Sequence, residues 1–572
     1  MNFLVLYVFT MLNTFATAQV DSIAYPPQDY FRAPLEIPLT LAGNFGEPRK
    51  AHFHTGLDFR TNQQEGLKVY AVADGYISRI NVSGAGYGNA LYIRHPNGWV
   101  SVYAHLKEFS TPIAEKLRKE QYARESFAVD FNLSEKELPV KKGEVIALSG
   151  NTGGSGGPHL HFEIRDTLDN TYNPMLFGYK LKDDLKPIVG FLKFYPLDSL
   201  KHRSDGYRIR PVLQNGVYEF TGGTIRMNAK RVGFSVNAYD VMNATEAHMG
   251  IYNLTVFDDN KMIYSAGFNK LSFPERRFVI SHVDYPVFMN EGRKSYHKCF
   301  TEPGNSCGIY SDIINAGEID LSDGKEHSVH IEITDFNGNV SQVRMKLKHD
   351  AAATTFKAKE FNYTTRFDYD HANEFGTSDF KVEIPKGCLF DDLYVSYSET
   401  PPNNAKIYSK VHQLSNSDVH LFDWFIVWVK ADSLPAELKD KAVVMHKDKA
   451  GATACKGGKF ENGFIAAKAR EFGQFYVMAD TTAPKIVPIN ITAGKNMRSY
   501  RKIMLKISDD LSGVADFDTY IDGKWVVTEY DAKSATLTHY ISSELKSGEH
   551  IFKTVVTDER KNTAEHSIKF NW

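Results

Sequence analysis

The chain has 572 residues, which is too long for a single hydrophobic core and predicts three or four domains. Apolar residues make up 42% of the chain and charged residues 24%, a composition that excludes a disordered chain and an integral membrane protein. The formal net charge of −2 gives no electrostatic case for binding nucleic acid or an anionic membrane surface.

The first residues indicate an export signal. Residues 3–12 form an apolar run too short to span a bilayer as a helix, and Ala16-Thr17-Ala18 before Gln19 has the pattern of a cleavage site. No Lys or Arg precedes the run, so an uncleaved anchor is the alternative. We expect residues 1–18 to be a signal peptide and 19–36 a leader draped over the first domain. The mature protein would then be periplasmic or associated with the cell envelope, or secreted, with no membrane span.

Residues 37–178 predict an antiparallel, all-β domain. Short runs rich in β-branched and aromatic residues are separated by turn signals such as Asp74-Gly75 and Pro96-Asn97-Gly98. No segment with helical periodicity alternates with these runs, which argues against a parallel sheet. The expected strands are 68–73, 76–81, 90–95, 99–105, 144–149 and 159–165.

An insertion at about 107–139 interrupts this pattern. Thr111 followed by Pro112 is a typical helix start, and the run to Glu125 is rich in helix formers. The segment is either a solvated surface helix or a wall beside a cleft. We favour the wall, because the insertion directly follows His105.

The rest of the chain contains an internal repeat. In both copies a His precedes an Asp by eight residues and an alternating apolar strand follows: His327 with Asp335, and His550 with Asp558. Short strands with such turns predict immunoglobulin-like β-sandwiches, in which both histidines are strand-edge residues rather than ligands. We expect such domains at 187–350 and 484–572, with another β-rich domain at 357–480.

Four cysteines are too few to form a disulfide framework in an exported chain of this length. Cys299 and Cys307 could close a small loop, and Cys388 and Cys455 could pair within the third domain. The sequence does not fix this connectivity.

The first domain carries side chains suited to metal and proton chemistry. His54 and Asp58 lie close together in sequence, and His105 ends an expected strand. After a glycine-rich stretch, His159 and His161 alternate with apolar residues, so both face the same side of a strand. A catalytic zinc site typically has three N or O protein ligands and one open position. One His, one carboxylate and a second His meet that count and leave two histidines to handle protons.

Each of these residues alone has an ordinary structural explanation, as a core histidine or a turn residue, but their coincidence favours a metal site. His52 and His95 are expected to be structural, although His52 lies two residues from His54. Asn89 and Tyr103 are candidates for groups that support the ligands.

The segments HxGxD, YAHL and GNTGxSxGPHLHFE, in this order, resemble the lysostaphin/LytM-type zinc metallopeptidases, which have the duplicated-hybrid-motif fold of cell-wall endopeptidases. The resemblance covers about residues 37–178. Retention of all five motif residues argues against the metal-free relatives that act as regulators. The resemblance implies that Zn²⁺ is bound by His54, Asp58 and His161 and that the catalytic histidines are His105 and His159.

This resemblance predicts a zinc-dependent endopeptidase that hydrolyses peptide bonds in the stem or cross-bridge peptides of peptidoglycan. The β-sandwich domains would hold the enzyme on the wall, on an envelope protein partner or on one another. The chain departs from compact members of the family in its insertion and in Gly156, where Ser or Thr is common. Two alternatives are a non-catalytic envelope protein that binds peptidoglycan or activates another hydrolase, and a secreted protease that acts on proteins.

Overall fold

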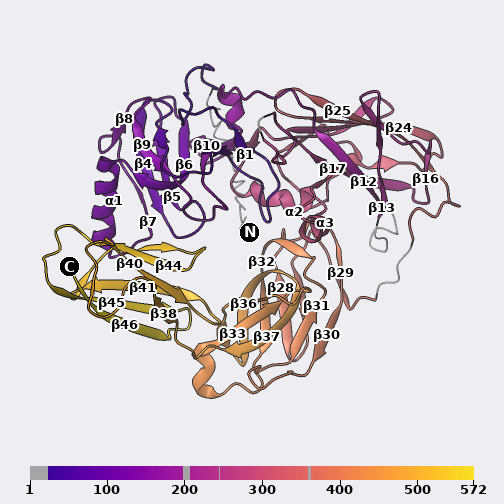
Figure 1. Cartoon of the computed structure of the whole chain (residues 1–572). Coiled ribbons are helices and arrows are strands. Elements are labelled where there is room, and N and C mark those ends of the chain that lie inside the picture. Colours follow the sequence, from indigo (N-terminus) through magenta and orange to yellow (C-terminus); the bar gives the residue numbers. More distant parts are fainter. Residues whose placement is uncertain (1–23, 198–205, 244, 358–361) are drawn as a thin grey trace, which may run out of the picture.

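The computed structural model describes residues 24–197, 206–243, 245–357 and 362–572, and it consists mostly of β-strands. The all-β prediction is confirmed. The predicted signal peptide and residues 19–23 of the leader lie outside the described residues. Within these ranges, no helix is long and apolar enough to cross a membrane. Four β-rich units follow one another around the molecule, and the last of them lies beside the first (Figure 1).

The N-terminal domain is organised around an antiparallel sheet. Its strand β10 (His159–Arg165) lies between β2 (Leu57–Arg60) and β6 (Val100–Phe109). Leu160 and Phe162 of β10 are fully buried in the core, and the alternation along the strand turns the residues between them to the other face. The remaining strands are β1 (Leu41–Gly43), β3 (Lys68–Tyr70), β4 (Gly75–Val82), β5 (Asn89–Arg94), β7 (Val129–Asn132), β8 (Pro139–Val140), β9 (Val145–Ser149) and β11 (Thr171–Tyr172), with a 3₁₀ turn at Pro174–Phe177.

The predicted helical insertion is present as α1 (Thr111–Arg124), with Pro112 in its first turn. The helix ends at Glu125, which has the left-handed conformation (φ 45°) common at helix ends. On its outer side, Tyr122 makes an edge-to-face contact with Trp525 of the C-terminal domain, at 5.4 Å between ring centroids. The insertion therefore packs between two domains.

The described part of the leader packs over the N-terminal domain. The Trp99 indole Nε1 donates to the carbonyl of Ala24 (3.1 Å), and Tyr25 stacks on the same ring (5.8 Å between centroids). Phe31 is buried and lies edge-on to His95. These apolar contacts order residues 24–36 against the domain.

The second domain is a two-layer β-sandwich. One sheet is centred on β12 (Ile188–Pro196) and β17 (Arg231–Tyr239), and the other on β24 (Glu326–Thr334) and β25 (Val340–His349), with an apolar core between them. The other strands are β13 (Tyr207–Ile209), β14 (Val212–Gln214), β15 (Val217–Glu219), β16 (Ile225–Met227), β18 (Asn253–Asp258), β19 (Lys261–Gly267), β20 (Lys270–Leu271), β21 (Tyr296–Lys298), β22 (Tyr310–Ser311) and β23 (Ile319–Asp320), with a 3₁₀ turn at Asn315–Gly317.

The core of the N-terminal domain continues into the second domain. Strand β11 pairs with β20, which adds a strand from the second domain to the first sheet. A helical segment, which the sequence analysis did not assign, consists of a 3₁₀ turn (Glu275–Phe278), α2 (Val279–His282) and α3 (Tyr285–Asn290). Its Val279 and Phe288 share one buried core with Phe53. Its Arg277 donates to the carbonyls of Leu421 and Phe422 in the third domain. This segment therefore joins three domains.

The third and C-terminal domains are also sandwiches of two main sheets, each with its own apolar core. The third domain comprises β26 (Thr365–Phe367), β27 (Asn373–Gly376), β28 (Phe380–Ile384), β29 (Leu393–Val395), β30 (Tyr397–Thr400), β31 (Val411–Leu414), β32 (His420–Lys430), β33 (Ala442–Lys447), β34 (Thr453–Cys455), β35 (Lys459–Glu461), β36 (Phe464–Glu471) and β37 (Gly473–Ala479), with a 3₁₀ turn at Ala436–Lys441. The C-terminal domain comprises β38 (Lys485–Pro488), β39 (Lys495–Asn496), β40 (Lys502–Ser508), β41 (Val514–Ile521), β42 (Lys524–Trp525), β43 (Glu529–Asp531), β44 (Thr536–Tyr540), β45 (Glu549–Asp558) and β46 (Thr563–Asn571).

The internal repeat corresponds to a β-hairpin in each of two sandwiches, β24–β25 and β45–β46. His327 lies in the first hairpin, with its Nδ1 3.0 Å from an Asp258 carboxylate oxygen. His550 lies at the equivalent place in the second, with its Nδ1 2.6 Å from Asp522. Each histidine thus pairs with an aspartate beside its own strand. The immunoglobulin-like class of these sandwiches stays a prediction.

The suggested disulfides do not form. All four cysteines are free, and Cys299, Cys307 and Cys388 are buried. Burial raises the pKa of the Cys299 thiol well above its usual value and that of Cys307 to about 12, so both remain protonated thiols in the core. The apolar cores and the interdomain contacts hold these domains together without crosslinks.

His95 generates a testable pH dependence. It is 2% exposed and lies within hydrogen-bond distance of the Asp74 carbonyl and the Ser101 hydroxyl, and burial lowers its pKa from 6.5 to about 4. Between these two pH values His95 binds a proton in the unfolded chain but stays neutral in the folded chain. With EDTA present, we expect His95 alone to lower the free energy of unfolding by about 1.4 kcal/mol per pH unit from pH 6.5 to about 4.

Hydrogen exchange of the β5 and β6 amides between pH 4 and 7 measures this slope. The variant His95→Gln should reduce the slope by that amount, whereas His371→Gln, at an exposed position in the third domain, should leave it unchanged. An unchanged slope in His95→Gln would contradict a neutral, buried His95.

Candidate metal centre

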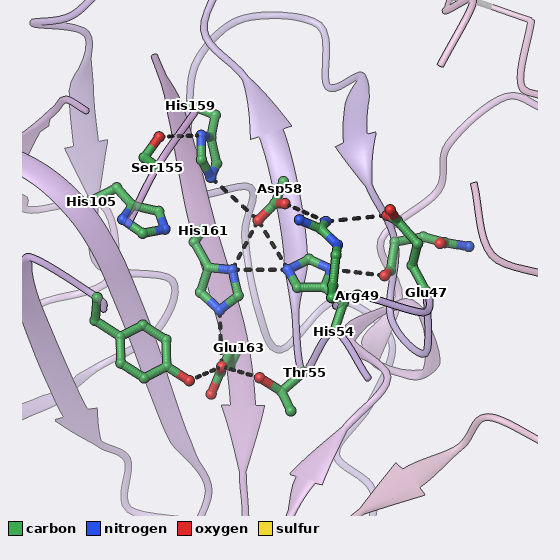
Figure 2. Close-up of polar contacts among 12 residues, drawn as sticks. Glu47, Arg49, His54, Thr55, Asp58, His105, Ser155, His159, His161 and Glu163 are labelled. Carbon is green, nitrogen blue, oxygen red and sulfur yellow. Dashed lines mark hydrogen bonds and ion pairs between the residues drawn. The ribbon is translucent and has the colours of Figure 1, made fainter. Parts of the chain in front are cut away.

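The pairing register of three strands brings the predicted residues together. In the sheet, His161 of β10 lies directly opposite Asp58 of β2 on one side and Ala104 of β6 on the other. His105, the next residue of β6, has a left-handed backbone (φ 59°), which is uncommon for a non-glycine residue. Figure 2 shows the side chains of His54, Asp58 and His161 converging, with those of His105 and His159 to one side.

The three residues predicted as ligands present their donor atoms to one point. Asp58 Oδ1 is 2.8 Å from His161 Nδ1 and 3.0 Å from His54 Nε2, and the two ring nitrogens are 3.0 Å apart. All three side chains are at least nine-tenths buried. Two nitrogens and one carboxylate oxygen are the donor set expected of a catalytic zinc site.

Hydrogen bonds on the far side of each ring fix where its proton lies. His54 Nδ1 is 2.8 Å from the Asn44 carbonyl, and His161 Nε2 is 2.9 Å from the Glu163 carboxylate. Both partners only accept, so the outer nitrogens of the neutral rings carry the protons and the inner nitrogens have bare lone pairs. Two lone pairs and a carboxylate repel one another at these distances. A metal cation between them removes that repulsion, so the donor set fits zinc.

In the metal-free protein a proton takes the place of that cation. Burial opposes charge on His161, but hydrogen bonds with Asp58 and Glu163 raise its pKa to about 9. The pKa of Asp58 is lowered well below its usual value: burial raises it, but the three surrounding histidines outweigh burial. Loading a metal must therefore release a proton from this cluster.

Glu163 anchors the outer side of the site and was not assigned a role from the sequence. Besides His161, its carboxylate accepts hydrogen bonds from Thr55 Oγ1 (2.7 Å), Tyr87 Oη (2.6 Å) and Arg165 Nε (2.6 Å). Burial raises the pKa of Glu163, but Arg165 and His161 lower it further, so the carboxylate stays ionised. Its position two residues after His161, on the same strand face, was the signal that could have identified it.

A second support acts on the carboxylate ligand. Arg49 donates to the other Asp58 oxygen, Oδ2, at 2.9 Å, and also to Glu47 at 3.1 Å (Figure 2). The bond fixes the rotation of the carboxylate so that Oδ1 faces the two imidazoles. Neither Arg49 nor Glu47 belongs to a recognisable motif, and only the fold reveals them.

His105 and His159 form the side of the centre opposite these supports. Their ring centroids are 4.8 Å apart. His105 Nδ1 lies 2.8 Å from the Thr152 carbonyl, and His159 Nδ1 lies 2.8 Å from the Gly157 carbonyl and 3.1 Å from Ser155 Oγ. Because the backbone carbonyls engage Nδ1 of both rings, each ring uses Nε2 for other partners. That of His159 is 3.4 Å from Asp58 Oδ1.

One glycine-rich loop, residues 150–157, carries both carbonyls and packs against a second loop, residues 83–88. Gly88 (φ 63°) and Gly153 (φ 69°) both have left-handed backbones, and a Cβ on either would lie within 2.6 Å of the other loop. The Gly154 amide also donates to the Gly86 carbonyl at 2.7 Å. Glycine is thus required where the two loops meet, and the contact holds the Thr152 and Gly157 carbonyls beside the histidines.

The C-terminal domain contacts the same loops. Lys533 Nζ donates to the carbonyls of Asn151 and, at 3.3 Å, Ser155, whose hydroxyl lies against His159. The Ala532 amide donates to the Gly84 carbonyl at 3.2 Å. A residue far along the sequence therefore supports the loop that orients His159.

The insertion forms one side of a cavity of 430 Å³ that the C-terminal domain completes. Leu117 and Arg118 of α1 line it together with Glu529 and Tyr540, and Lys107, two residues after His105, lies at its edge. The size is within the range of ligand-binding pockets. The wall suggested for the insertion from the sequence thus borders this cavity rather than the ligands themselves.

The remaining candidates lie as follows. The Tyr103 hydroxyl accepts a hydrogen bond from the Val72 amide (3.0 Å), away from the three ligands. The Asn89 amide donates to Thr152 Oγ1 (3.0 Å), so Asn89 supports the loop beside His105. Burial, with the charge of Arg276 as the next cause, lowers the pKa of His52 to about 4.

The contact between Lys533 and the loop predicts a change in loop protection. We expect Lys533→Met to increase amide exchange in residues 150–157, because two carbonyls lose their donor. Metal content should not change, since Lys533 touches none of the three ligands. Exchange measured by mass spectrometry on the full chain tests this. Lys524→Met, an exposed lysine of the same domain, is the matched control. Equal exchange in both variants would show that the contact gives the loop no support.

Comparison with known proteins gives two family matches. Residues 52–123 and 127–174 match the model of peptidase family M23, and residues 364–480 match the model of a Zu5-like domain. The first match includes all five motif residues, and the second falls in the third, β-rich domain.

Three similar proteins each cover about a quarter of this chain or less. The DD-carboxypeptidase/endopeptidase Mpg of Neisseria meningitidis is 41% identical over 112 residues, which is 20% of either chain. The peptidoglycan DD-endopeptidase ShyA of Vibrio cholerae is 30% identical over 141 residues, 23% of this chain and 26% of its own. The catalytic domain of lysostaphin from Staphylococcus simulans is 24% identical over 24% of this chain and 91% of its own, with a TM-score of 0.19.

The match to Mpg spans about a fifth of that relative's length, so the comparison concerns one domain and not the whole chain. Within that domain, the motif order, the family model and the curated relatives agree. The N-terminal domain of this chain therefore matches peptidase family M23, the lysostaphin/LytM-type peptidases that its motifs resemble.

Proposed function

We propose that this protein is a zinc-dependent endopeptidase of the cell envelope that hydrolyses peptide bonds in the stem or cross-bridge peptides of peptidoglycan. The convergence of His54 Nε2, Asp58 Oδ1 and His161 Nδ1 within 3.0 Å of one another carries the proposal. Two further histidines stand beside this donor set. A module that only binds peptidoglycan would need neither the three converging donor atoms nor the two additional histidines.

The donor set accommodates Zn²⁺ through His54, Asp58 and His161. When bound, zinc would supply Lewis-acid activation of a water molecule and of the scissile carbonyl. The chain supplies the orientation of the ligands. The Asn44 carbonyl, Glu163 and Arg49 each hold one of them from the outer side, and supports of this kind tune metal affinity.

His105 and His159 handle the protons. Each ring has its Nδ1 engaged by a backbone carbonyl, so Nε2 is the atom that accepts or donates a proton in the cleft. In its neutral form one ring takes the proton of the attacking water. In its protonated form the other donates a hydrogen bond to the oxyanion that develops on the scissile carbonyl.

The names of the relatives support peptidoglycan as the substrate. Mpg is named a DD-carboxypeptidase/endopeptidase and ShyA a peptidoglycan DD-endopeptidase. The expected export signal agrees with a substrate outside the cytoplasm. We further propose that the three sandwich domains position the enzyme on the wall or on an envelope partner.

Metal binding gives the first test of this function. The variant Asp58→Asn removes the negative ligand but keeps its size, so we expect zinc content to fall from about one equivalent to below 0.1. Asp130→Asn, which alters an exposed aspartate paired with Arg79 in the same domain, is the control and should keep its zinc. Elemental analysis of the purified full chain measures both. Stoichiometric zinc in Asp58→Asn would contradict the ligand assignment.

Catalysis is tested at the two histidines that bind no metal. We expect His105→Ala and His159→Ala to retain zinc but to lose about 10²–10⁴-fold in kcat, the usual contribution of general acid–base catalysis. Mass spectrometry of muropeptides released from purified sacculi gives the readout. Identical release by wild type and His159→Ala would remove the catalytic claim.

Two further results would favour the alternatives. A non-catalytic envelope protein would bind sacculi without releasing peptides and lose nothing on chelation. A general secreted protease would digest casein at least as fast as sacculi.

A further inference from the structure

Three aspartates meet where the N-terminal domain joins the second domain. Asp183 lies in the connecting segment, Asp240 at the end of β17, and Asp335 in the turn after β24. One carboxylate oxygen from each lies within 4.8 Å of those of the other two. This limit is close to the spacing of oxygen ligands around one Ca²⁺, which lie 2.3–2.6 Å from the ion, so the three carboxylates are positioned to share such an ion.

The cluster contains an oxygen that the protein leaves unpaired. Asp240 is 4% exposed, and its buried Oδ1 has no hydrogen-bond partner among the described residues. The carboxylate borders a cavity of 20 Å³, enough for one ion or water, which Asp183 also lines. Burial, followed by the charges of Asp335 and Asp183, raises the pKa of Asp240 to about 8. No basic side chain is among the charges that act on it.

A second cluster repeats this arrangement between the third and C-terminal domains, in Asp480, Asp509 and Asp558. Each turn aspartate accepts hydrogen bonds from the amide and side chain of an Asn four residues later. The same Asn side chain donates to the carbonyl of the linker aspartate, at 3.2 Å in the first cluster and 3.0 Å in the second.

The correspondence extends to the unpaired oxygen. Asp509 Oδ1, like Asp240 Oδ1, is buried without a partner among the described residues. Buried like charges destabilise a fold unless they are compensated. Both copies of the repeat have three aspartates at the same place, which indicates that the two clusters bind the same kind of ligand.

We propose that Asp183, Asp240 and Asp335 bind one Ca²⁺ at the junction between the N-terminal and second domains. The ligands come from a linker, a strand end and a hairpin turn, so the ion fixes the relative position of three elements. Carboxylate and amide oxygens are the ligands that Ca²⁺ prefers, and Asn337 and Asn44 also line the cavity.

The site adjoins the metal centre through one residue. The Asn44 side chain exchanges two hydrogen bonds with the Gly250 backbone of the second domain. Its own carbonyl lies against His54 Nδ1 at 2.8 Å. An ordered junction would therefore hold Asn44 in place, and Asn44 in turn orients His54, a proposed zinc ligand.

The test is a Ca²⁺ titration of the zinc-loaded full chain, followed by calorimetry and by hydrogen exchange in 181–185, 240–243 and 335–339. We expect saturable binding with a dissociation constant of roughly 10⁻⁵–10⁻³ M and added protection in these three segments. In Asp240→Asn the protection should disappear and the affinity of this site should fall at least ~10-fold. Mg²⁺ at the same concentration should protect less.

Asp166→Asn is the matched control, because Asp166 caps the same type of turn, with Asn170 four residues later, but belongs to no carboxylate cluster. It should leave Ca²⁺ binding unchanged. The melting temperature of Asp240→Asn in EDTA should equal or exceed that of wild type, since a repulsion has been removed. If it is lower, Asp183→Asn, at a partly exposed position, replaces it in the same titration.

Absence of Ca²⁺-dependent protection in wild type would overturn the proposal. So would equal protection in wild type and in Asp240→Asn. Equal stability of Asp240→Asn and wild type without any Ca²⁺ effect would show instead that a proton alone neutralises the cluster.

Discussion

The candidate centre depends on the register between β10 and its two neighbours. His161 faces Asp58 across one pair of strands and Ala104 across the other, so a single alignment brings two predicted ligands together and places His105 beside them. A shift of one residue would turn His159 and His161 into the core and Leu160 and Phe162 into the cleft. The apolar side of β10 therefore fixes the register on which the polar side depends.

Charge is concentrated around this register and balanced locally. Asp58 is held between histidines and Arg49, and Glu163 between His161 and Arg165. Each buried carboxylate thus has a cationic or hydrogen-bonding partner, as the interior of a protein requires. The acidic clusters at Asp240 and Asp509 depart from this balance, because each contains a buried carboxylate oxygen without a hydrogen-bond partner among the described residues.

The sequence predicted much of the N-terminal domain because its signals are local. The alternation around His159 and His161, the turn glycines and the start of α1 at Thr111 all depend on neighbouring residues. The supports of the ligands could not be predicted in this way, since Arg49 and Tyr87 approach only after folding. The helix α3 did carry local signals, an Asp284 N-cap followed by Pro286, but a β-rich setting obscured them. The suggested disulfides failed because sequence spacing does not determine where buried thiols lie.

The contact between Lys533 and Asn151 joins residues 382 positions apart. During synthesis, the loop beside His159 emerges long before the strands that carry its support, so the loop lacks this contact until those strands have formed. Completion of the C-terminal domain is then a late event in maturation. An unfinished or clipped chain that lacks this domain would have its histidines in place but the loop beneath them released from one of its anchors.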